Sequence, residues 1–272
     1  MNLENYFISQ FQNKAIGDDG VVIGDYVYSK DAFFENVHYK KSWLSYYDIA
    51  KRAMLVNISD GYAMGAKPKY ALLAVAMPKS MNRTDMKELA RGFQETAQKH
   101  DIEIIGGDTI SNVKLDITVT IISERVHTLQ RKGVRDNYLF AYTGELGRSA
   151  QDLKRLQNLG KIHAKSKFVD IQLRTKFLEK TRGVLKAGMD ISDGLFSDMA
   201  KLSDANATGV KFFKAIPKAK GCSGEEYEML VSFSPRDRKK LIRLAALSRT
   251  KLTIFAKATR NRYKNRCKAH HF

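Results

Sequence analysis

The apolar and polar positions of the chain follow two periods, and these periods predict the order of its helices and strands. Apolar residues recur at helical spacing in two long segments, whereas the run LDITVTIIS at 115–123 has the β-branched residues of a strand. The order β-α-β-α-β-β predicts an α+β unit that ends near residue 125. The expected elements are strands over 21–29 (a strand pair), 70–77, 102–105 and 115–123, and helices over 42–64 and 83–100.

The pattern restarts after Gly133 and predicts a second unit. The four prolines of the chain all stand between predicted elements, and no low-complexity linker separates the units. We therefore predict two domains, residues 1–126 and 127–272. The elements expected in the second are strands over 138–143, 226–233 and 252–256, helices over 150–159, 175–186 and 235–246, and a helix that begins at Ser192-Asp193.

Composition places the chain among ordinary globular proteins, with 43% hydrophobic and 28% charged residues. The apolar run YALLAVAMP is too short to cross a bilayer, and the first residues lack the pattern of a secretory signal. Two cysteines, Cys222 and Cys267, do not suggest a disulfide framework or a metal site. We expect both to be free thiols, and we expect a cytoplasmic protein without membrane association.

The formal net charge of +18 leaves several interpretations open. No Asp or Glu occurs from Arg249 to Phe272, a stretch rich in Lys and Arg. This excess can form a solvated basic surface, attract phosphorylated ligands or bind nucleic acid. Nucleic acid is the least favoured partner, because the basic residues are not interleaved with aromatic residues and no zinc finger is present.

Aspartates stand where predicted elements begin or end. The tetrapeptide ISDG occurs twice, at 58–61 and at 191–194, and each copy places an Asp beside apolar residues. Each Asp taken alone is explained by a helix cap or a turn. Together they favour a hard divalent cation such as Mg²⁺, since carboxylates are rare in apolar surroundings unless they are paired or metal-bound. The aspartates concerned are Asp19, Asp31, Asp60, Asp108, Asp190 and Asp193.

Mg²⁺ bound by carboxylates is typical of phosphoryl transfer. The chain contains no GxxxxGK[ST] loop, no GxGxxG that opens a helix and no protein-kinase signature. A kinase would therefore need another architecture.

Six motifs follow one another along the chain: IGDDGVV (16–22), SKDAFFENVHY (29–39), NISDGYAMGAKP (57–68), IIGGDT (104–109), MDISDGL (189–195) and SGEEYEML (223–230). In this order they resemble the thiamine-monophosphate kinase family, whose superfamily includes aminoimidazole ribonucleotide synthetase. The resemblance implies a two-domain α+β or α/β fold of the aminoimidazole ribonucleotide synthetase type. Its N-terminal domain carries a sheet with flanking helices and pairs in a homodimer, and its C-terminal α/β domain completes the substrate cleft.

The resemblance also implies an activity: ATP phosphorylates thiamine monophosphate directly, with Mg²⁺, in the last step of thiamine diphosphate biosynthesis. Two alternatives remain, a related kinase or synthetase acting on another small acceptor, and a basic nucleic-acid-binding protein on the same scaffold. A selenophosphate synthetase is disfavoured, because the N-terminal region contains no cysteine.

The family's functional residues map onto this sequence by motif. The implied metal ligands are Asp19, Ser29, Asp31, Asp60, Asp108, Asp190 and Asp193. The implied catalytic residues are Asp60, Asp108 and Asp193, and the implied nucleotide contacts are Gly107, Asp108, Arg131 and Ser192. His38 and Glu225 resemble substrate contacts, and the neighbouring Glu226 is an alternative to Glu225. We expect Asp60 from one domain to face Asp190 and Asp193 from the other, the latter two on one helical face.

Two positions and two segments depart from the family pattern. Lys30 replaces a small polar residue, so only its backbone carbonyl can serve a metal. The segment 165–176 lacks the expected proline-bearing basic pattern, and 211–221 is compressed. Ala269 stands where the family often has an aromatic residue. The last three departures concern recognition of the thiamine part more than binding of Mg²⁺ and ATP.

Overall fold

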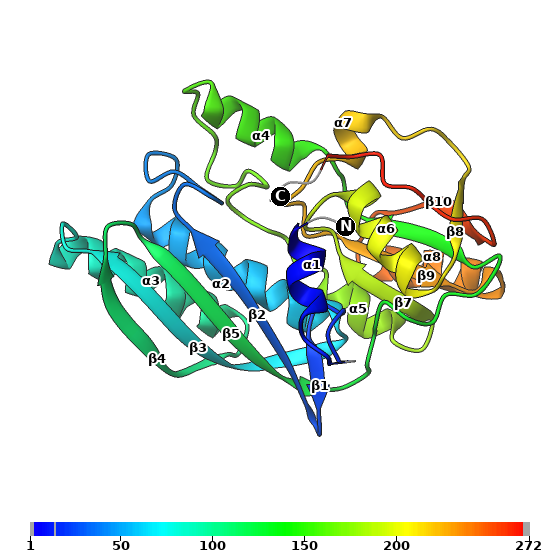
Figure 1. The fold of residues 1–272 in the computed structure, drawn as a ribbon, viewed down its shortest axis with the longest axis horizontal. Coiled ribbons are helices and arrows are strands. Elements are labelled where there is room, and N and C mark those ends of the chain that lie inside the picture. The colour runs from blue at the N-terminus through cyan, green and yellow to red at the C-terminus, as the bar shows by residue number, and fades with distance from the viewer. Residues whose placement is uncertain (1–2, 14, 269–272) are drawn as a thin grey trace.

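Two five-stranded sheets, one in each half of the chain, form the protein. The computed structural model describes residues 3–13 and 15–268. Figure 1 shows the first sheet at the left and the second at the right, with helices packed on both. A short helix, α1 (Leu3–Ser9), precedes the first sheet.

The first sheet has the strand order β1-β2-β5-β3-β4. All its neighbouring strands are antiparallel except β3 and β4, which are parallel and joined by a helix. The strands are β1 (Val21–Ile23), β2 (Tyr26–Phe34), β3 (Ala66–Pro78), β4 (Glu103–Asn112) and β5 (Asp116–Arg125), and the helices are α2 (Tyr46–Ala63) and α3 (Arg83–Lys99).

The second sheet is antiparallel throughout, with the order β7-β9-β6-β10-β8. Its strands are β6 (Leu139–Thr143), β7 (Leu185–Asp190), β8 (Gly209–Phe212), β9 (Met229–Phe233) and β10 (Leu252–Thr259). The helices of this half are α4 (Arg148–Gln157), α5 (Thr175–Thr181), α6 (Leu195–Ala205), α7 (Lys218–Gly221) and α8 (Arg238–Leu247), with a 3-10 turn at Pro235–Asp237.

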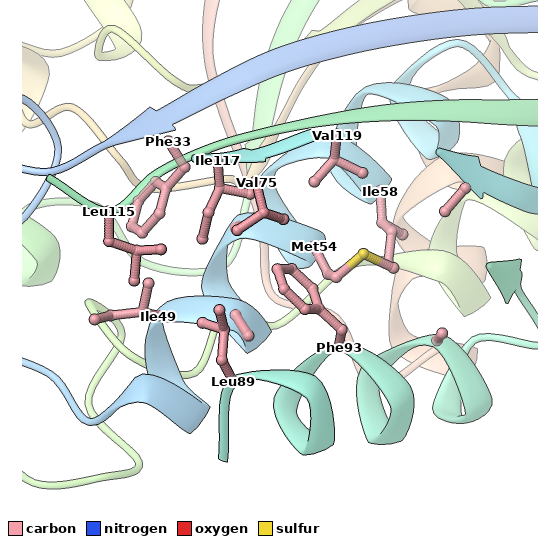
Figure 2. Close-up of a cluster of buried hydrophobic side chains, with 14 of the residues drawn as sticks. Phe33, Ile49, Met54, Ile58, Val75, Leu89, Phe93, Leu115, Ile117 and Val119 are labelled. Carbon is pink, nitrogen blue, oxygen red and sulfur yellow. The ribbon is translucent and has the colours of Figure 1, made fainter. Parts of the chain in front are cut away.

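Helix α2 is buried on most of its surface because it lies between the first sheet and α3. Figure 2 shows Met54 and Ile58 between sheet residues such as Val119 and Phe93 of α3. Ser45 caps the helix by accepting a hydrogen bond from the backbone N–H of Asp48. A helix packed on two sides is held rigidly, so the backbone positions of the polar and charged side chains that it carries are fixed.

Strand β4 continues through the two glycines where we expected it to stop. Gly106 and Gly107 pair with Leu72 and Leu73 of β3, and Asp108 pairs with Ala74. Gly107 has a φ of 150°, and a Cβ there would lie 1.6 Å from the carbonyl oxygen of Leu73. Glycine is therefore required for the close approach of the two strands, and in this chain it does not mark a turn.

The second ISDG does not begin a helix as expected. Asp190 is the last residue of β7, Asp193 lies in a bend, and α6 starts at Leu195 after Gly194 with φ of 98°. Asp190 and Asp193 consequently do not share a helical face. The predicted helix over 175–186 was also too long, because α5 ends at Thr181 and the missed strand β7 follows.

The expectation of two free thiols was wrong, because Cys222 and Cys267 form a disulfide bond. The two residues are 45 positions apart in sequence, and the fold brings their Cα atoms to 5.6 Å. Such proximity depends on tertiary structure and cannot be read from spacing. The bond ties the segment after β10 to the residue that directly precedes Ser223-Gly224-Glu225.

No helix in the described part of the chain is both long and apolar enough to cross a membrane. The replacement of an aromatic residue by Ala269 lies outside the described residues.

Candidate active site

A cavity of about 360 Å³ lies where the two halves of the molecule meet, and carboxylates from both halves line it. Nine of the residues predicted from sequence are among its lining residues: Asp19, Asp31, His38, Asp60, Arg131, Asp190, Ser192, Asp193 and Glu225. The two copies of ISDG thus face the same cavity from different halves of the molecule, the first from α2 and the second from the segment after β7.

Three of these carboxylates form a compact group. Asp19 follows the N-terminal segment, Asp60 lies on α2 and Asp190 ends β7. One carboxylate oxygen of each lies within 4.8 Å of the other two. Oxygen ligands at this spacing are what a hard divalent cation requires.

Burial raises the pKa of each carboxyl in this group and that of the neighbouring Asp31. The pKa of Asp60 is well above its usual value because of burial and the charges of Asp31 and Asp190. The pKa of Asp190 is raised by burial and by the charge of Asp19. Burial, together with nearby acids of which Glu225 is the strongest, raises the pKa of Asp31 to about 6. A bound cation would relieve this repulsion, so the chemistry of the residues fits a divalent metal.

Two polar residues of α2 hold these carboxylates in place, and sequence analysis had assigned neither a role. Asn57 is fully buried, and its Oδ1 accepts a hydrogen bond from the backbone N–H of Asp31 at 2.6 Å. Ser59 donates a hydrogen bond to Asp190 across the two halves, at 2.5 Å. Both lie within the motif NISD, so the unassigned polar residues of that motif were the available signal.

Arg131, the predicted nucleotide contact, pairs with Asp19. Its Nη2 lies 2.6 Å from Asp19 Oδ1, and its Nη1 donates to the carbonyl of Gly17 at 3.0 Å. Burial and this ion pair act in opposite directions on the pKa of Asp19, and the pKa remains raised. Arg131 thereby orders the loop that delivers Asp19 and places a guanidinium in the cavity, where it can also bind phosphate.

The predicted substrate contacts lie on different elements. His38 follows β2, and its Nδ1 accepts a hydrogen bond from the backbone N–H of Phe34 at 3.0 Å. A neutral imidazole with this bond carries its proton on Nε2. Glu225 lines the cavity, whereas Glu226 is buried and accepts bonds from Gly147 and Ser223. The geometry therefore favours Glu225 over Glu226 as a ligand contact.

Two lysines of the cavity were not predicted as site residues. Lys201 on α6 lies 2.5 Å from Asp193 Oδ2 and 3.1 Å from Asp198 Oδ1. The i,i+3 spacing of Asp198 and Lys201 was a sequence signal for this cluster. The ammonium of Lys30, a residue of β2, donates to the hydroxyl of Thr118 at 3.0 Å and therefore lies beside the neighbouring strand β5.

Three predicted residues are not among those lining the cavity: Ser29, Gly107 and Asp108. Ser29 is buried on β2 and donates to the carbonyl of Asn57 at 3.4 Å. Asp108 is exposed on β4 and pairs in register with Ala74, next to the core residue Val75. Because successive strand residues face opposite sides, Asp108 points to the sheet face away from α2 and α3.

A second group of buried carboxylates, Glu226 and Glu228, is neutralised by protein cations. Arg174 contacts Glu228 with two hydrogen bonds of 2.7 and 2.6 Å. Lys167 lies 2.9 Å from both Glu226 and Glu228. The segment 165–176, which departs from the family pattern, therefore supplies the cations that hold SGEEYE in place.

Comparison with known proteins identifies relatives of this chain. Residues 17–124 match the family described as AIR synthase related protein, N-terminal domain. The thiamine-monophosphate kinase of Buchnera aphidicola subsp. Schizaphis graminum (strain Sg) is 32% identical over 262 residues, which cover 85% of this chain and 80% of that protein. The thiamine-monophosphate kinase of Bacillus subtilis (strain 168) is 30% identical over 198 residues, covering 68% and 61% of the two chains.

The fold is also that of a solved relative. The structure of AaThiL complexed with AMPPCP and TMP superposes with a TM-score of 0.88 at 20% identity, covering 99% of this chain and 96% of that one. This likeness confirms the predicted fold of the aminoimidazole ribonucleotide synthetase type. With the identity to the Buchnera protein over most of both chains, it follows that this chain belongs to the thiamine-monophosphate kinase family.

Proposed function

We propose that this enzyme transfers the γ-phosphoryl group of ATP to thiamine monophosphate, which yields thiamine diphosphate and completes its biosynthesis. The observation that carries the proposal is the convergence of Asp19, Asp60 and Asp190 from both halves of the molecule at one cavity. Relatives named thiamine-monophosphate kinase and the AaThiL complex with AMPPCP and TMP support the choice of donor and acceptor.

The chain's own residues would position and neutralise two phosphorylated ligands. The proposed metal ligands are Asp19, Asp31, Asp60, Asp190 and Asp193. Bound Mg²⁺ supplies charge neutralisation between the donor and acceptor phosphates. Arg131 holds the loop of Asp19 and offers a guanidinium to the nucleotide, together with Ser192. Because a phosphate monoester is already ionised near neutral pH, the proposed reaction needs no strong general base.

His38 and Glu225 are the proposed contacts to the acceptor. His38 lines the cavity, and its Nδ1 accepts a hydrogen bond from the backbone N–H of Phe34, which orients the ring. Glu225 adds a carboxylate that suits a cationic acceptor such as a thiazolium ring.

We further propose a homodimer that pairs through the face of the first sheet opposite α2 and α3. Leu72 and Ala74 are exposed on this face, and Asp108 shares it by strand register. Pairing there would deliver Asp108 and Gly107 to the site of a partner chain, which would reconcile their motif with their distance from the cavity in their own chain. A mixed dimer of one Asp60→Asn chain and one Asp108→Asn chain would then contain one intact site. Mixing the two variants should restore part of the activity that each lacks alone, and no restoration would contradict a shared site.

We propose a cytoplasmic location, where ATP and Mg²⁺ are available. Cell fractionation measures this: recovery of the protein with the cytosolic fraction supports the location, and recovery outside that fraction contradicts it.

The decisive experiment incubates the protein with ATP, Mg²⁺ and thiamine monophosphate and detects the product by mass. Thiamine diphosphate should form, and EDTA should stop its formation. Formation of ADP with another small phosphate acceptor, and none with thiamine monophosphate, would favour the related-kinase alternative. Salt-sensitive nanomolar RNA or DNA binding without ATP turnover would favour the nucleic-acid alternative.

A further inference from the structure

Arg52 joins the two halves of the molecule beside the cavity. It lies on α2 in the first half, and its side chain is fully buried. Its Nη2 is 2.6 Å from Glu225 Oε2, and its Nη1 donates to the carbonyl of Phe168. Its guanidinium lies over the ring of Phe168, 4.4 Å from the centroid. A buried guanidinium is unfavourable unless its partners are well placed, so loss of either side of the Arg52–Glu225 pair would leave a charge without its partner.

The loop that Arg52 grips has an unfavourable backbone conformation. Glu225 and Tyr227 have φ of 59° and 50°, in the left-handed region that bulky residues rarely adopt. Their backbone N–H groups donate to the carbonyls of Ser192 and Ile191 at 2.7 and 2.8 Å. Arg52 also contacts the side chains of this loop. It pairs with the Glu225 carboxylate, and its guanidinium carbon lies 5.9 Å from the centroid of the Tyr227 ring. Without it, the carboxylate can leave the cavity wall by local rearrangement.

Arg52 itself is not among the residues that line the cavity, whereas Glu225, Tyr227 and Ser192 are. Arg52 therefore acts on a ligand through Glu225. Since α2 also carries Asp60, the same helix fixes both a carboxylate of the metal group and the position of Glu225.

We propose that Arg52 is a positioning residue that holds the Glu225 carboxylate in place for the phosphate acceptor. The inference deepens the proposed function and rests on it for the identity of the acceptor. The contact uses two edges and one face of a planar guanidinium. A lysine at this position could restore the charge but not all three contacts.

The test compares Arg52→Met and Arg52→Lys with Lys51→Met as a matched control. Lys51 is the preceding residue on α2 and forms its own ion pair across the halves, 2.5 Å from Asp170, without contact to Glu225. Arg52→Met should raise the KM for thiamine monophosphate about 10- to 100-fold and leave the KM for ATP and kcat within about threefold. Arg52→Lys should recover part of the loss, and Lys51→Met should match the wild type.

A double variant tests whether Arg52 acts through Glu225. If it does, Arg52→Met combined with Glu225→Gln should raise the KM no further than Glu225→Gln alone. The proposal would be overturned if the double variant raised the KM by the product of the two single effects. It would also be overturned if Arg52→Met left the KM for thiamine monophosphate unchanged, or raised the KM values for both substrates equally. Should Arg52→Met fail to fold, Arg52→Lys carries the same comparison.

Hydrogen exchange separates failure of this inference from failure of the proposed function. The amides of Glu225 and Tyr227 should exchange faster in both Arg52 variants than in the wild type and in Lys51→Met, with no acceptor present. If the wild type does not phosphorylate thiamine monophosphate but the Arg52 variants still exchange faster than the wild type, the acceptor is refuted and the positioning role is kept. Unchanged exchange would refute the positioning role.

Discussion

The molecule contains two groups of buried carboxylates, and it treats them in opposite ways. Glu226 and Glu228 are matched by Lys167 and Arg174 at hydrogen-bonding distance. Burial acts to raise the pKa of Glu228, but the hydrogen bonds and charges of Arg174 and Lys167 prevail and lower it below its usual value. This group is neutral within the protein.

The group at the cavity lacks this balance. Arg131 pairs with Asp19. The pKa values of Asp60 and Asp190 are nevertheless raised, by burial and by the charges of the neighbouring aspartates. Evolution of a stable fold alone gives no reason to retain such repulsion, because replacing one carboxylate would remove it. Buried acids matched by protein cations therefore stabilise the fold, whereas unmatched ones mark a place for an external cation.

The largest effect is expected from breaking the matched group. Glu228→Gln should lower the free energy of unfolding by about 3–5 kcal/mol, because it leaves Lys167 and Arg174 without a full counter-charge. Urea unfolding followed by circular dichroism measures this. A loss below about 1 kcal/mol would show that Glu228 is not a clamp.

Breaking the unmatched group should affect turnover. Asp60→Asn should reduce kcat for thiamine diphosphate formation by at least about 100-fold, because a carboxylate that neutralises the transition state is lost. Steady-state assays at saturating Mg²⁺ measure the loss. Near-wild-type turnover would remove Asp60 from the site.

Mg²⁺ should stabilise the protein, and more so at higher pH. In the metal-free protein the pKa of Asp31 is about 6, above its ordinary value of 3.8, so its contribution to stability is lost as pH rises from about 4 to 6. A cation offsets this loss where the carboxylates are ionised, and a ligand at one hundred times its Kd stabilises by about 2.7 kcal/mol. The rise in Tm with Mg²⁺ should therefore be larger at pH 7.5 than at pH 5, whereas equal rises would contradict the argument.

The smallest effect is expected on the stability of the metal-free protein, where the two groups of carboxylates should respond with opposite signs. Without metal, Asp60→Asn should increase the free energy of unfolding by about 1 kcal/mol, since it removes an unmatched buried carboxyl. Glu228→Gln should decrease it under the same conditions. A decrease for both variants would mean that the two groups do not differ in kind.

Sequence patterns predicted the long helices and most strands, because α2, α3 and β5 have clear periods. They failed where tertiary contacts override local signals. Gly106 and Gly107 look like a stop signal, but parallel pairing with β3 carries the strand through them. Strand β8 is a four-residue strand whose pairing to β10 gives no local pattern.

For the cavity, motifs predicted nine residues that lie together and three that do not line it. Asp108 was assigned by its motif, while strand register, which the motif does not encode, turns it to the opposite face. Arg52 was missed because one cation in a helical pattern resembles a solvated residue; its burial comes from Phe168 and Glu225, more than one hundred residues away. The Cys222–Cys267 bond was missed because tertiary structure brings the two residues together across 45 positions of sequence.

Direct binding of a divalent cation tests the central claim most closely. Electron paramagnetic resonance can count Mn²⁺ bound to the wild type, to Asp60→Asn and to Lys51→Met, each with ATP present. Wild type and Lys51→Met should bind Mn²⁺ equally, and Asp60→Asn should lose at least one bound ion or about 10- to 100-fold in affinity. Equal Mn²⁺ binding by all three proteins would contradict the claim that the unmatched carboxylates form the metal site.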